Sequence, residues 1–267
     1  MLKFASICPH PPIMIPSIGK NHLSEIKSTL KAMNELGNRI KKEEISTIAI
    51  ISPHGPVQMD TMSINGSETI NGNFLQFGDD TSMKIKNNLD LVGNIKKISE
   101  IKNITTEIVR DNIPLDHGVM VPLYFLKKHS PEIKIVSIAF SYLDFEKHFE
   151  FGEAIYEAIE TIDENIALIA SGDLSHRLIP ESPSGYSPKG KEFDELLIKY
   201  LKNNEVSEII NLNSELIENA GECGLRSIII LLGALSSLKY KFQKMSYEGP
   251  FGVGYLVGEF KLLKNNK

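Results

Sequence analysis

The sequence has no tryptophan, only two cysteines, and no block of lysine and arginine residues. Two cysteines cannot make a disulfide framework, and a reducing compartment would keep both as thiols. The 29 basic and 34 acidic residues give a net charge of −5, which argues against nucleic-acid binding. No apolar run reaches the ~18 residues that a membrane-spanning helix needs, and no cationic leader precedes the first strand-like segment. We therefore expect a cytoplasmic protein that binds neither nucleic acid nor membranes.

What the sequence does contain is an alternation of strand-like and helix-like segments. Its 267 residues, 42% of them hydrophobic, are enough to bury the core of one large α/β domain. Several expected strands are apolar throughout, which is typical of strands buried on both faces. This pattern predicts a mostly parallel or mixed central sheet with helices on both faces. Without an internal repeat or linker, residues 1–267 are expected to form a single domain.

Hydrophobic periodicity places the individual elements. The expected strands are residues 2–8, 47–52, 105–109, 134–140 and 165–170, with a closing antiparallel pair at 242–247 and 254–260. The expected helices are residues 21–42, 81–101, 116–128, 144–162, 190–203, 206–212 and 225–238. Two further short strands, 60–65 and 73–77, lie around Asn-Gly turns and predict a β-hairpin.

Three histidines, His10, His54 and His176, follow apolar strands at the point where each strand ends. Open α/β sheets bind ligands outside the carboxyl ends of their strands, so one sheet edge could bring these imidazoles together. Neutral imidazoles are good ligands for borderline divalent metals. The pattern predicts a metal centre or catalytic crevice, against the alternative that each histidine is only a turn residue with a satisfied imidazole.

Two residues near these strand ends allow two interpretations each. His117 either begins a helix capped by Asp116 or faces the same pocket. Asp173 either orients His176 or caps a local turn, as aspartate often does.

Glu222 and Cys223 immediately precede the helix expected at 225–238. Two histidines and a carboxylate, with open coordination positions, are the ligand set of non-heme Fe(II) oxygen chemistry. A helix N-terminus also lowers a thiol pKa, which makes a cysteine thiolate a competent metal ligand. The other cysteine, Cys8, lies within the first strand and is expected to be buried.

These residues lie in five short segments: 6–12 (SICPHPP), 52–55 (SPHG), 116–122 (DHGVMVP), 172–176 (GDLSH) and 222–234 (ECGLRSIIILLGA). In this order, over essentially the whole chain, they resemble the catalytic B-subunit superfamily of class III extradiol ring-cleavage dioxygenases. That superfamily also contains the Memo proteins.

The resemblance implies an α/β oxidoreductase that uses Fe(II) and O2 to cleave the ring of a catechol-type aromatic, as in aromatic compound catabolism. It implies that His10 and His54 bind the metal and that His176 is the catalytic acid/base. His117 would hydrogen-bond oxygen or substrate. The resemblance leaves open whether a small second subunit is needed, and a homodimer is the commonest arrangement for a soluble oligomer.

The third metal ligand is ambiguous. When the Leu-Leu-Gly-Ala end of the helix is aligned with the dioxygenases, Cys223 falls at the position of their carboxylate ligand and Glu222 lies one residue earlier. One residue corresponds to a rotation of about 100° on a helix, so the two side chains cannot point at the metal in the same way. A Cys-Gly-Arg pattern occurs at this place in Memo proteins. We favour Glu222, since a carboxylate suits oxygen activation, and keep Cys223 as the competing ligand.

Two other functions share these residues. One is a Memo-like metal or redox binding protein without ring cleavage, and the other is a hydrolase that uses metal-activated water. The substrate, and the choice between iron, zinc and copper, cannot be derived from the sequence.

Overall fold

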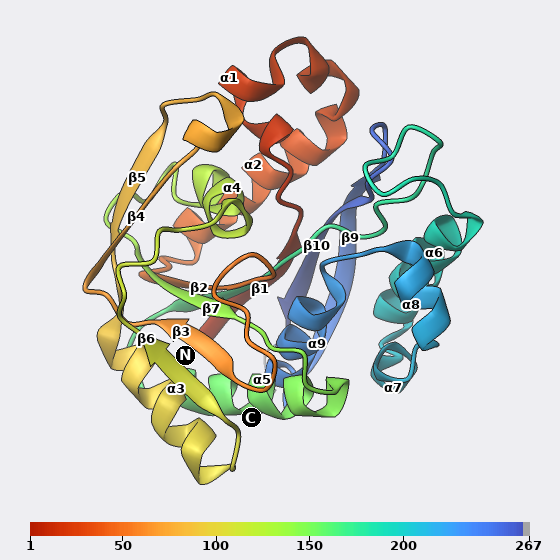
Figure 1. The fold of residues 1–267 in the computed structure, drawn as a ribbon. Helices are drawn as coiled ribbons and strands as arrows, with labels where there is room; N and C mark the ends of the chain where they lie inside the picture. The colour runs from red at the N-terminus through yellow and green to blue at the C-terminus, as the bar shows by residue number, and fades with distance from the viewer. Residues whose placement is uncertain (264–267) are drawn as a thin grey trace.

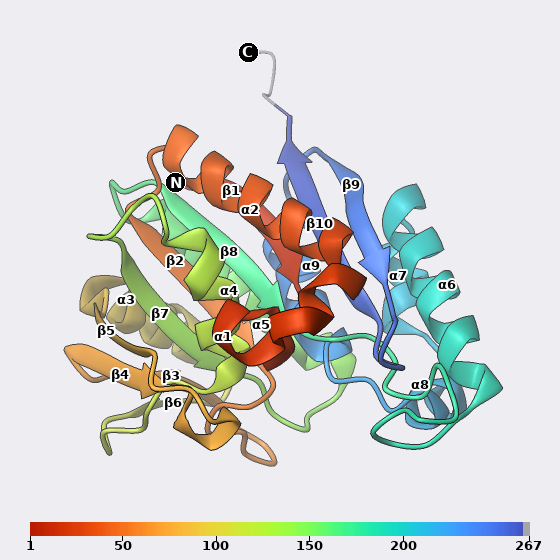
Figure 2. The same cartoon turned by 90° about the horizontal axis from the view of Figure 1, so that it is seen from above.

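The computed structural model describes residues 1–263, in which an eight-stranded sheet lies between two layers of helices (Figures 1 and 2). Its strands are β1 (Leu2–Cys8), β2 (Thr47–Ser52), β3 (Met62–Asn65), β6 (Thr106–Val109), β7 (Lys134–Ala139), β8 (Ile166–Ser171), β9 (Tyr240–Glu248) and β10 (Tyr255–Leu262). Their order is β6-β3-β7-β2-β8-β1-β10-β9. β7, β2, β8 and β1 run parallel, whereas β10 is antiparallel to β1 and β9.

Helices cover both faces of this sheet. α2 (Lys27–Lys42) and α4 (His117–Leu126) pack on one face. The other face carries α3 (Leu89–Ile101), α5 (Phe145–Glu160) and α9 (Leu225–Ala234). The shorter or outlying elements are η1 (Pro12–Met14), α1 (Pro16–Gly19), η2 (Lys20–Glu25), η3 (Leu75–Phe77), α6 (Pro188–Asn203), α7 (Val206–Ile210) and α8 (Ser214–Ala220). The predicted α/β fold with a mixed sheet covered on both faces is confirmed.

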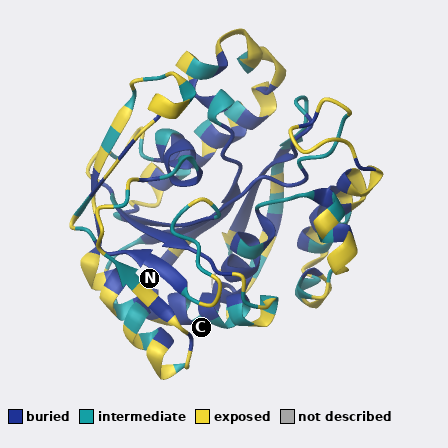
Figure 3. Ribbon diagram, in the orientation of Figure 1, coloured by how far each residue is buried: buried dark blue, intermediate teal, exposed yellow. Residues whose placement is uncertain are grey.

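The central strands explain why the sequence shows uninterrupted apolar runs. Every residue of β2 and β8 is buried, because successive side chains enter the two cores alternately. In β1, for example, Ala5 and Ile7 belong to one core and Phe4 and Cys8 to the other. Figure 3 shows the buried sheet between helices whose outer faces are exposed. The expected burial of Cys8 is confirmed.

The predicted hairpin of residues 60–65 with 73–77 is wrong. β3 joins the main sheet, parallel to β6 and antiparallel to β7. The hairpin that does form pairs β4 (Thr69–Asn73) with β5 (Ser82–Lys86) in a separate two-stranded sheet.

The helix predicted over residues 81–101 is wrong in its first part. Residues 82–86 alternate along the strand β5, with Ile85 as the buried residue. The helix α3 begins only at Leu89, after Asn88 accepts a hydrogen bond from the backbone N–H of Leu91. The alternation has the period of two that is typical of a strand. Because the segment is short and a helical pattern follows it directly, the predicted helix extends over it.

Two smaller differences concern the helices. The helix expected at 21–42 begins at Lys27, after the 3₁₀ turn η2, and the short helix α8 has no counterpart among the expected helices. Across residues 1–263, no helix combines the length and the hydropathy that crossing a bilayer requires.

Candidate metal centre

His10, His54 and Cys223 converge at the carboxyl ends of β1 and β2 and the start of α9. His10 Nε2 lies 3.1 Å from His54 Nε2 and 3.6 Å from Cys223 Sγ. The candidate donor atoms of the three residues all lie within 4.8 Å of one another. Two nitrogens that are each bonded at about 2.1 Å to one tetrahedral ion are about 3.4 Å apart, so this spacing fits a shared metal.

Ser171, the last residue of β8, sets the tautomer of His10. Its hydroxyl donates to the carbonyl oxygen of Gly118 at 2.5 Å, so its oxygen accepts from Nδ1–H of His10 at 2.9 Å. The proton therefore sits on Nδ1, and the Nε2 lone pair faces the cluster, as metal-binding histidines require. Burial holds the pKa of His10 well below its usual value, and the charges of His54, His117 and His176 lower it further.

Asp173 ties the loop after β1 to the start of α9. Its Oδ1 accepts from the backbone N–H of His10 at 3.0 Å. Its backbone N–H donates to Cys223 Sγ at 3.3 Å, and its carbonyl accepts from the N–H of Cys223 at 3.3 Å. These hydrogen bonds of Asp173 hold His10 and Cys223 in place. None of them reaches the ring of His176, which Asp173 would orient in one of the two interpretations from the sequence.

Glu222 lies at the start of α9 but is not one of the three converging residues. Its Oε2 accepts from the backbone N–H of Leu225 at 2.6 Å and so caps the helix. Burial raises the pKa of Glu222 to about 7, although the hydrogen bond from Leu225 and the charge of Arg226 oppose the rise.

Cys223 instead directs its sulfur at His10. Burial raises the pKa of the Cys223 thiol well above its usual value, and the carboxyls of Asp173 and Glu222 raise it further. A bound metal cation reverses this balance, because a coordinating thiol is deprotonated.

His117 is both the first residue of α4 and a neighbour of the cluster. Asp116 caps the helix by accepting from the backbone N–H of Val119 at 3.2 Å. The His117 ring stacks on His54 with centroids 4.2 Å apart and lies 5.3 Å from the ring of His10. Burial, followed by the charge of His54, lowers the pKa of His117 to about 4. His117 is therefore neutral at pH 7.

His176 contributes a fourth imidazole to this region. Its Nδ1–H donates to the carbonyl of Gly221 at 2.7 Å, which leaves the Nε2 lone pair available. Burial lowers the pKa of His176; the hydrogen bond to Gly221 opposes this, and the charge of His54 adds to it. A neutral imidazole held in one tautomer is suited to general-base chemistry.

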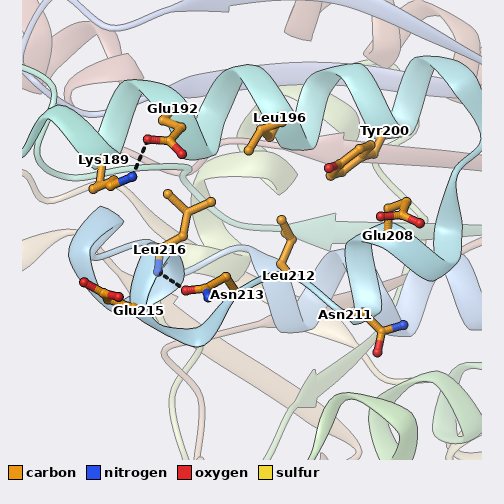
Figure 4. A pocket seen from close by; sticks show the side chains of 10 residues that line it. All are labelled: Lys189, Glu192, Leu196, Tyr200, Glu208, Asn211, Leu212, Asn213, Glu215 and Leu216. Carbon is orange, nitrogen blue, oxygen red and sulfur yellow. Dashed lines mark hydrogen bonds and ion pairs between the residues drawn. The ribbon is translucent and has the colours of Figure 1, made fainter.

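A pocket of about 640 Å³ opens beside His54 and His117. Its lining residues are His54, Gly55, Pro56, Asn73, Gln76, Ile113, Pro114, Leu115, Asp116 and His117. Another cavity, of about 380 Å³, lies between α6 and the α7–α8 segment and is lined by leucines, acidic residues and the Lys189–Glu192 ion pair (Figure 4). Its lining contains no histidine or cysteine. The pocket at His54 is therefore the candidate substrate pocket.

Residues 4–258 match the family described as the catalytic LigB subunit of aromatic ring-opening dioxygenase. The chain belongs to this family. The resemblance found in the sequence is thereby confirmed at the level of the family.

Two curated proteins and one solved structure are similar to this LigB-family chain. Protein CA_C1420 of Clostridium acetobutylicum is 37% identical over 269 residues, which cover 97% of this chain but only 58% of that protein. A 3,4-dihydroxyphenylacetate 2,3-dioxygenase of Escherichia coli is 28% identical over 239 residues, which cover 83% of this chain and 85% of the relative. Uncharacterized protein JW3007 from Escherichia coli K12 shares the fold, with a TM-score of 0.70 and 17% sequence identity. The superposition covers 96% of this chain and 99% of that protein.

Sequence reasoning missed the serines that support the histidines of this LigB-family site. Ser171 ends β8 and holds His10. Ser52 ends β2, donates to Asp116 Oδ1 at 2.6 Å and accepts from the backbone N–H of His54 at 3.2 Å. A serine as the last residue of a mostly apolar strand was the available signal in both cases.

Proposed function

We propose that this protein is a metal-dependent dioxygenase that opens the ring of an aromatic diol. The observation that carries this proposal is the convergence of His10 and His54, with the imidazole of His176, held in one tautomer, close enough for its charge to lower the pKa of His10. Fe(II) in this site would supply Lewis acidity and the redox chemistry that couples the diol to O2. Membership of the LigB family and the name of the Escherichia coli relative support the same reaction class.

In this proposal, His10 and His54 hold the metal through Nε2, and Cys223 is the third donor. Imidazoles suit iron, zinc and copper, whereas a thiolate favours the softer ions. Glu222, the ligand favoured from the sequence, binds the N–H of Leu225 through Oε2, and its carboxylate is not among the donor atoms that converge. The donor set therefore fits a borderline metal, and Cys223 replaces Glu222 as our proposed third ligand.

The other histidines handle protons and position the substrate. His176 accepts a proton from a diol hydroxyl at Nε2 and returns it later, while its bond to Gly221 holds the ring in place. His117, stacked on His54 at the pocket wall, offers a ring nitrogen to the substrate or to oxygen. Both roles require neutral imidazoles, which agrees with the lowered pKa of each residue.

One observation favours a second candidate, a Memo-like metal or redox binding protein without ring cleavage. It is the position of Cys223, whose soft sulfur lies where an oxygen-activating site would have a carboxylate. The hydrolase alternative uses the same residues, and no contact among residues 1–263 favours it. The cytoplasmic location and the homodimer stay predictions.

Two variants at the start of α9 test the ligand assignment by metal titration. We expect Cys223→Ser to weaken metal binding at least ~10-fold, since the third donor is lost and even the loss of a residue that only supports a ligand costs this much. Glu222→Gln keeps an oxygen that can cap Leu225 and should bind metal as the parent does. Loss of metal in Glu222→Gln, with retention in Cys223→Ser, would restore Glu222 as the third ligand.

A further inference from the structure

We propose, resting on the proposed function, that Asp194 and Ser175 are positioning residues that hold the imidazole of His176 for proton transfer. Asp194 belongs to α6, and Ser175 directly precedes His176 in the chain. Both residues are fully buried, and neither belongs to the converging donor set. Buried polar groups are unfavourable unless they form hydrogen bonds, and the bonds of these two residues lead from α6 to the loop that carries His176.

Ser175 fixes the segment that orients the ring of His176. The ring is held through Nδ1 by the backbone carbonyl of Gly221. The Ser175 hydroxyl donates to the neighbouring carbonyl of Ala220 at 2.8 Å, and the backbone N–H of His176 donates to the same oxygen at 3.2 Å. The Ser175 oxygen also accepts from the N–H of Arg177 at 3.0 Å. Ser175 therefore sets the distance between the backbone of His176 and the carbonyl that orients its ring.

Asp194 anchors Ser175 to α6, which packs against β9 (Figures 1 and 2). Its Oδ1 accepts from the backbone N–H of Ser175 at 2.8 Å, and its Oδ2 accepts from the hydroxyl of Tyr247 at 2.6 Å. The carboxyl fits closely, because a Cβ added at Gly254 would lie 2.2 Å from Oδ2. The N–H of Gly254 donates to the carbonyl of Ser175 at 2.8 Å. The N–H, the carbonyl and the hydroxyl of Ser175 are thus all bonded, which fixes the residue before His176 in one conformation.

A different set of bonds holds Cys223. Its backbone N–H donates to the carbonyl of Asp173, and the N–H of Asp173 donates to Sγ, each at 3.3 Å. Neither bond involves Ser175 or Asp194. Loss of Asp194 should therefore release His176 while Cys223 stays in place.

The expected effect of this release is on the rate of the reaction. A catalytic group that moves by about 1 Å can lower a rate by ~10²-fold. A ring that loses its bond to Gly221 can also present either nitrogen to the diol, since the hydrogen bond at one nitrogen decides which of the two carries the proton. Metal binding does not depend on this ring in the proposed function.

Asp194→Leu removes both hydrogen bonds of the carboxyl and keeps the size of the side chain. Asp194→Asn is the matched control, because it keeps an oxygen for the N–H of Ser175 and can donate to the Tyr247 hydroxyl. O2 uptake with catechol and metal content are measured on the full chain after anaerobic loading with Fe(II). We expect kcat to fall by ~10–100-fold in Asp194→Leu with the metal retained, and to keep its parental value in Asp194→Asn. Loss of metal in Asp194→Leu, or an equal fall in both variants, contradicts the proposal.

The variant His176→Ala tests whether Asp194 acts through His176. If it does, adding Asp194→Leu to His176→Ala should leave the residual rate unchanged, because the effects of residues that act through one group do not add. A further fall by the same factor as in Asp194→Leu alone would show general structural damage and exclude the positioning role. Ser175→Ala gives the same cycle by breaking the bond to Ala220, and it decides the question if Asp194→Leu does not fold.

The tautomer of His176 separates the positioning from the reaction. Nitrogen NMR of the histidine side chains in the metal-free full chain should show the Nδ1–H tautomer of His176 in the parent and in Asp194→Asn. Asp194→Leu should show a mixture of both tautomers; an unchanged tautomer there overturns the positioning, whatever the rates. A parent that binds Fe(II) but consumes no O2 with catechols overturns ring cleavage, and the NMR result then decides the positioning alone.

Discussion

Ser171 stands behind His10 and decides which ring nitrogen faces the cluster, through its bonds to His10 Nδ1 and the carbonyl of Gly118. We expect Ser171→Ala to weaken metal binding by ~10–100-fold, the usual effect of removing a group that orients a ligand. The measurement is a metal titration. Ser6→Ala, at another buried serine in the neighbouring strand β1, is the control. Unchanged metal affinity in Ser171→Ala would remove the tautomer argument.

At the residue scale, the convergence of His10 and His54 could be predicted from the sequence, but which of Glu222 and Cys223 converges with them could not. His10 and His54 follow strands whose ends are fixed by long apolar runs. The directions in which the side chains of Glu222 and Cys223 point depend on the backbone conformation between α8 and α9. There Gly221 adopts the left-handed conformation, with φ of 62°, and Gly224 packs against Gly172. Which of these two adjacent side chains points at His10 therefore depends on tertiary contacts, which the local sequence pattern does not reveal.

The contact between the end of β8 and the start of α9 leaves no room for a side chain. A Cβ added to Gly172 would lie 2.1 Å from the Cα of Gly224. We expect Gly172→Ala to push α9 away, to lower the free energy of unfolding by about 1–3 kcal/mol and to weaken metal binding because Cys223 moves from His10. Chemical denaturation and metal titration measure the two effects.

Gly93→Ala is the matched control, because a Cβ there meets nothing within 4 Å on the exposed side of α3. It should raise the free energy of unfolding by roughly 0.5–1 kcal/mol, since alanine is the better helix former. Equal effects of the two substitutions would show that the contact between Gly172 and Gly224 does not position α9.

At the element scale, the sequence revealed the βα units but not the pairing of the short strands. β2 and β8 are buried on both faces and so appear as apolar runs of strand length. β3 pairs instead with β6 and β7, which follow it by about 40 and 70 residues along the chain. Such pairing depends on long-range contacts, whereas hairpin prediction uses only adjacent segments.

At the scale of the whole molecule, Asp194 links three distant segments. This buried residue of α6 accepts from the backbone N–H of Ser175 at 2.8 Å and from the hydroxyl of Tyr247 at 2.6 Å. Burial raises the pKa of Asp194 to about 7, and the bonds from Tyr247 and Ser175 oppose the rise. The folded protein therefore binds this proton more tightly than the unfolded chain does.

The sign of the pH dependence follows from this raised pKa. The contribution of Asp194 to stability is full below its unfolded pKa of about 4 and is lost as pH rises towards 7. Asp194→Asn mimics the protonated form, so the free energy of unfolding of this variant, relative to that of the parent, should rise by on the order of 4 kcal/mol between pH 4 and pH 8. Urea unfolding at both pH values measures it, and a pH-independent difference would contradict the raised pKa.

The central claim is that the His10–His54 cluster and His176 together open the ring of a diol. The most direct measurement is O2 uptake by the anaerobically Fe(II)-loaded protein after addition of a catechol, with His176→Ala beside the parent and metal content measured in both. We expect one O2 consumed per diol in the parent, and in His176→Ala a rate lower by ~10²–10⁴, as for a lost proton-transfer group, with the metal retained. A metal-loaded parent that consumes no O2 with any catechol would contradict the account.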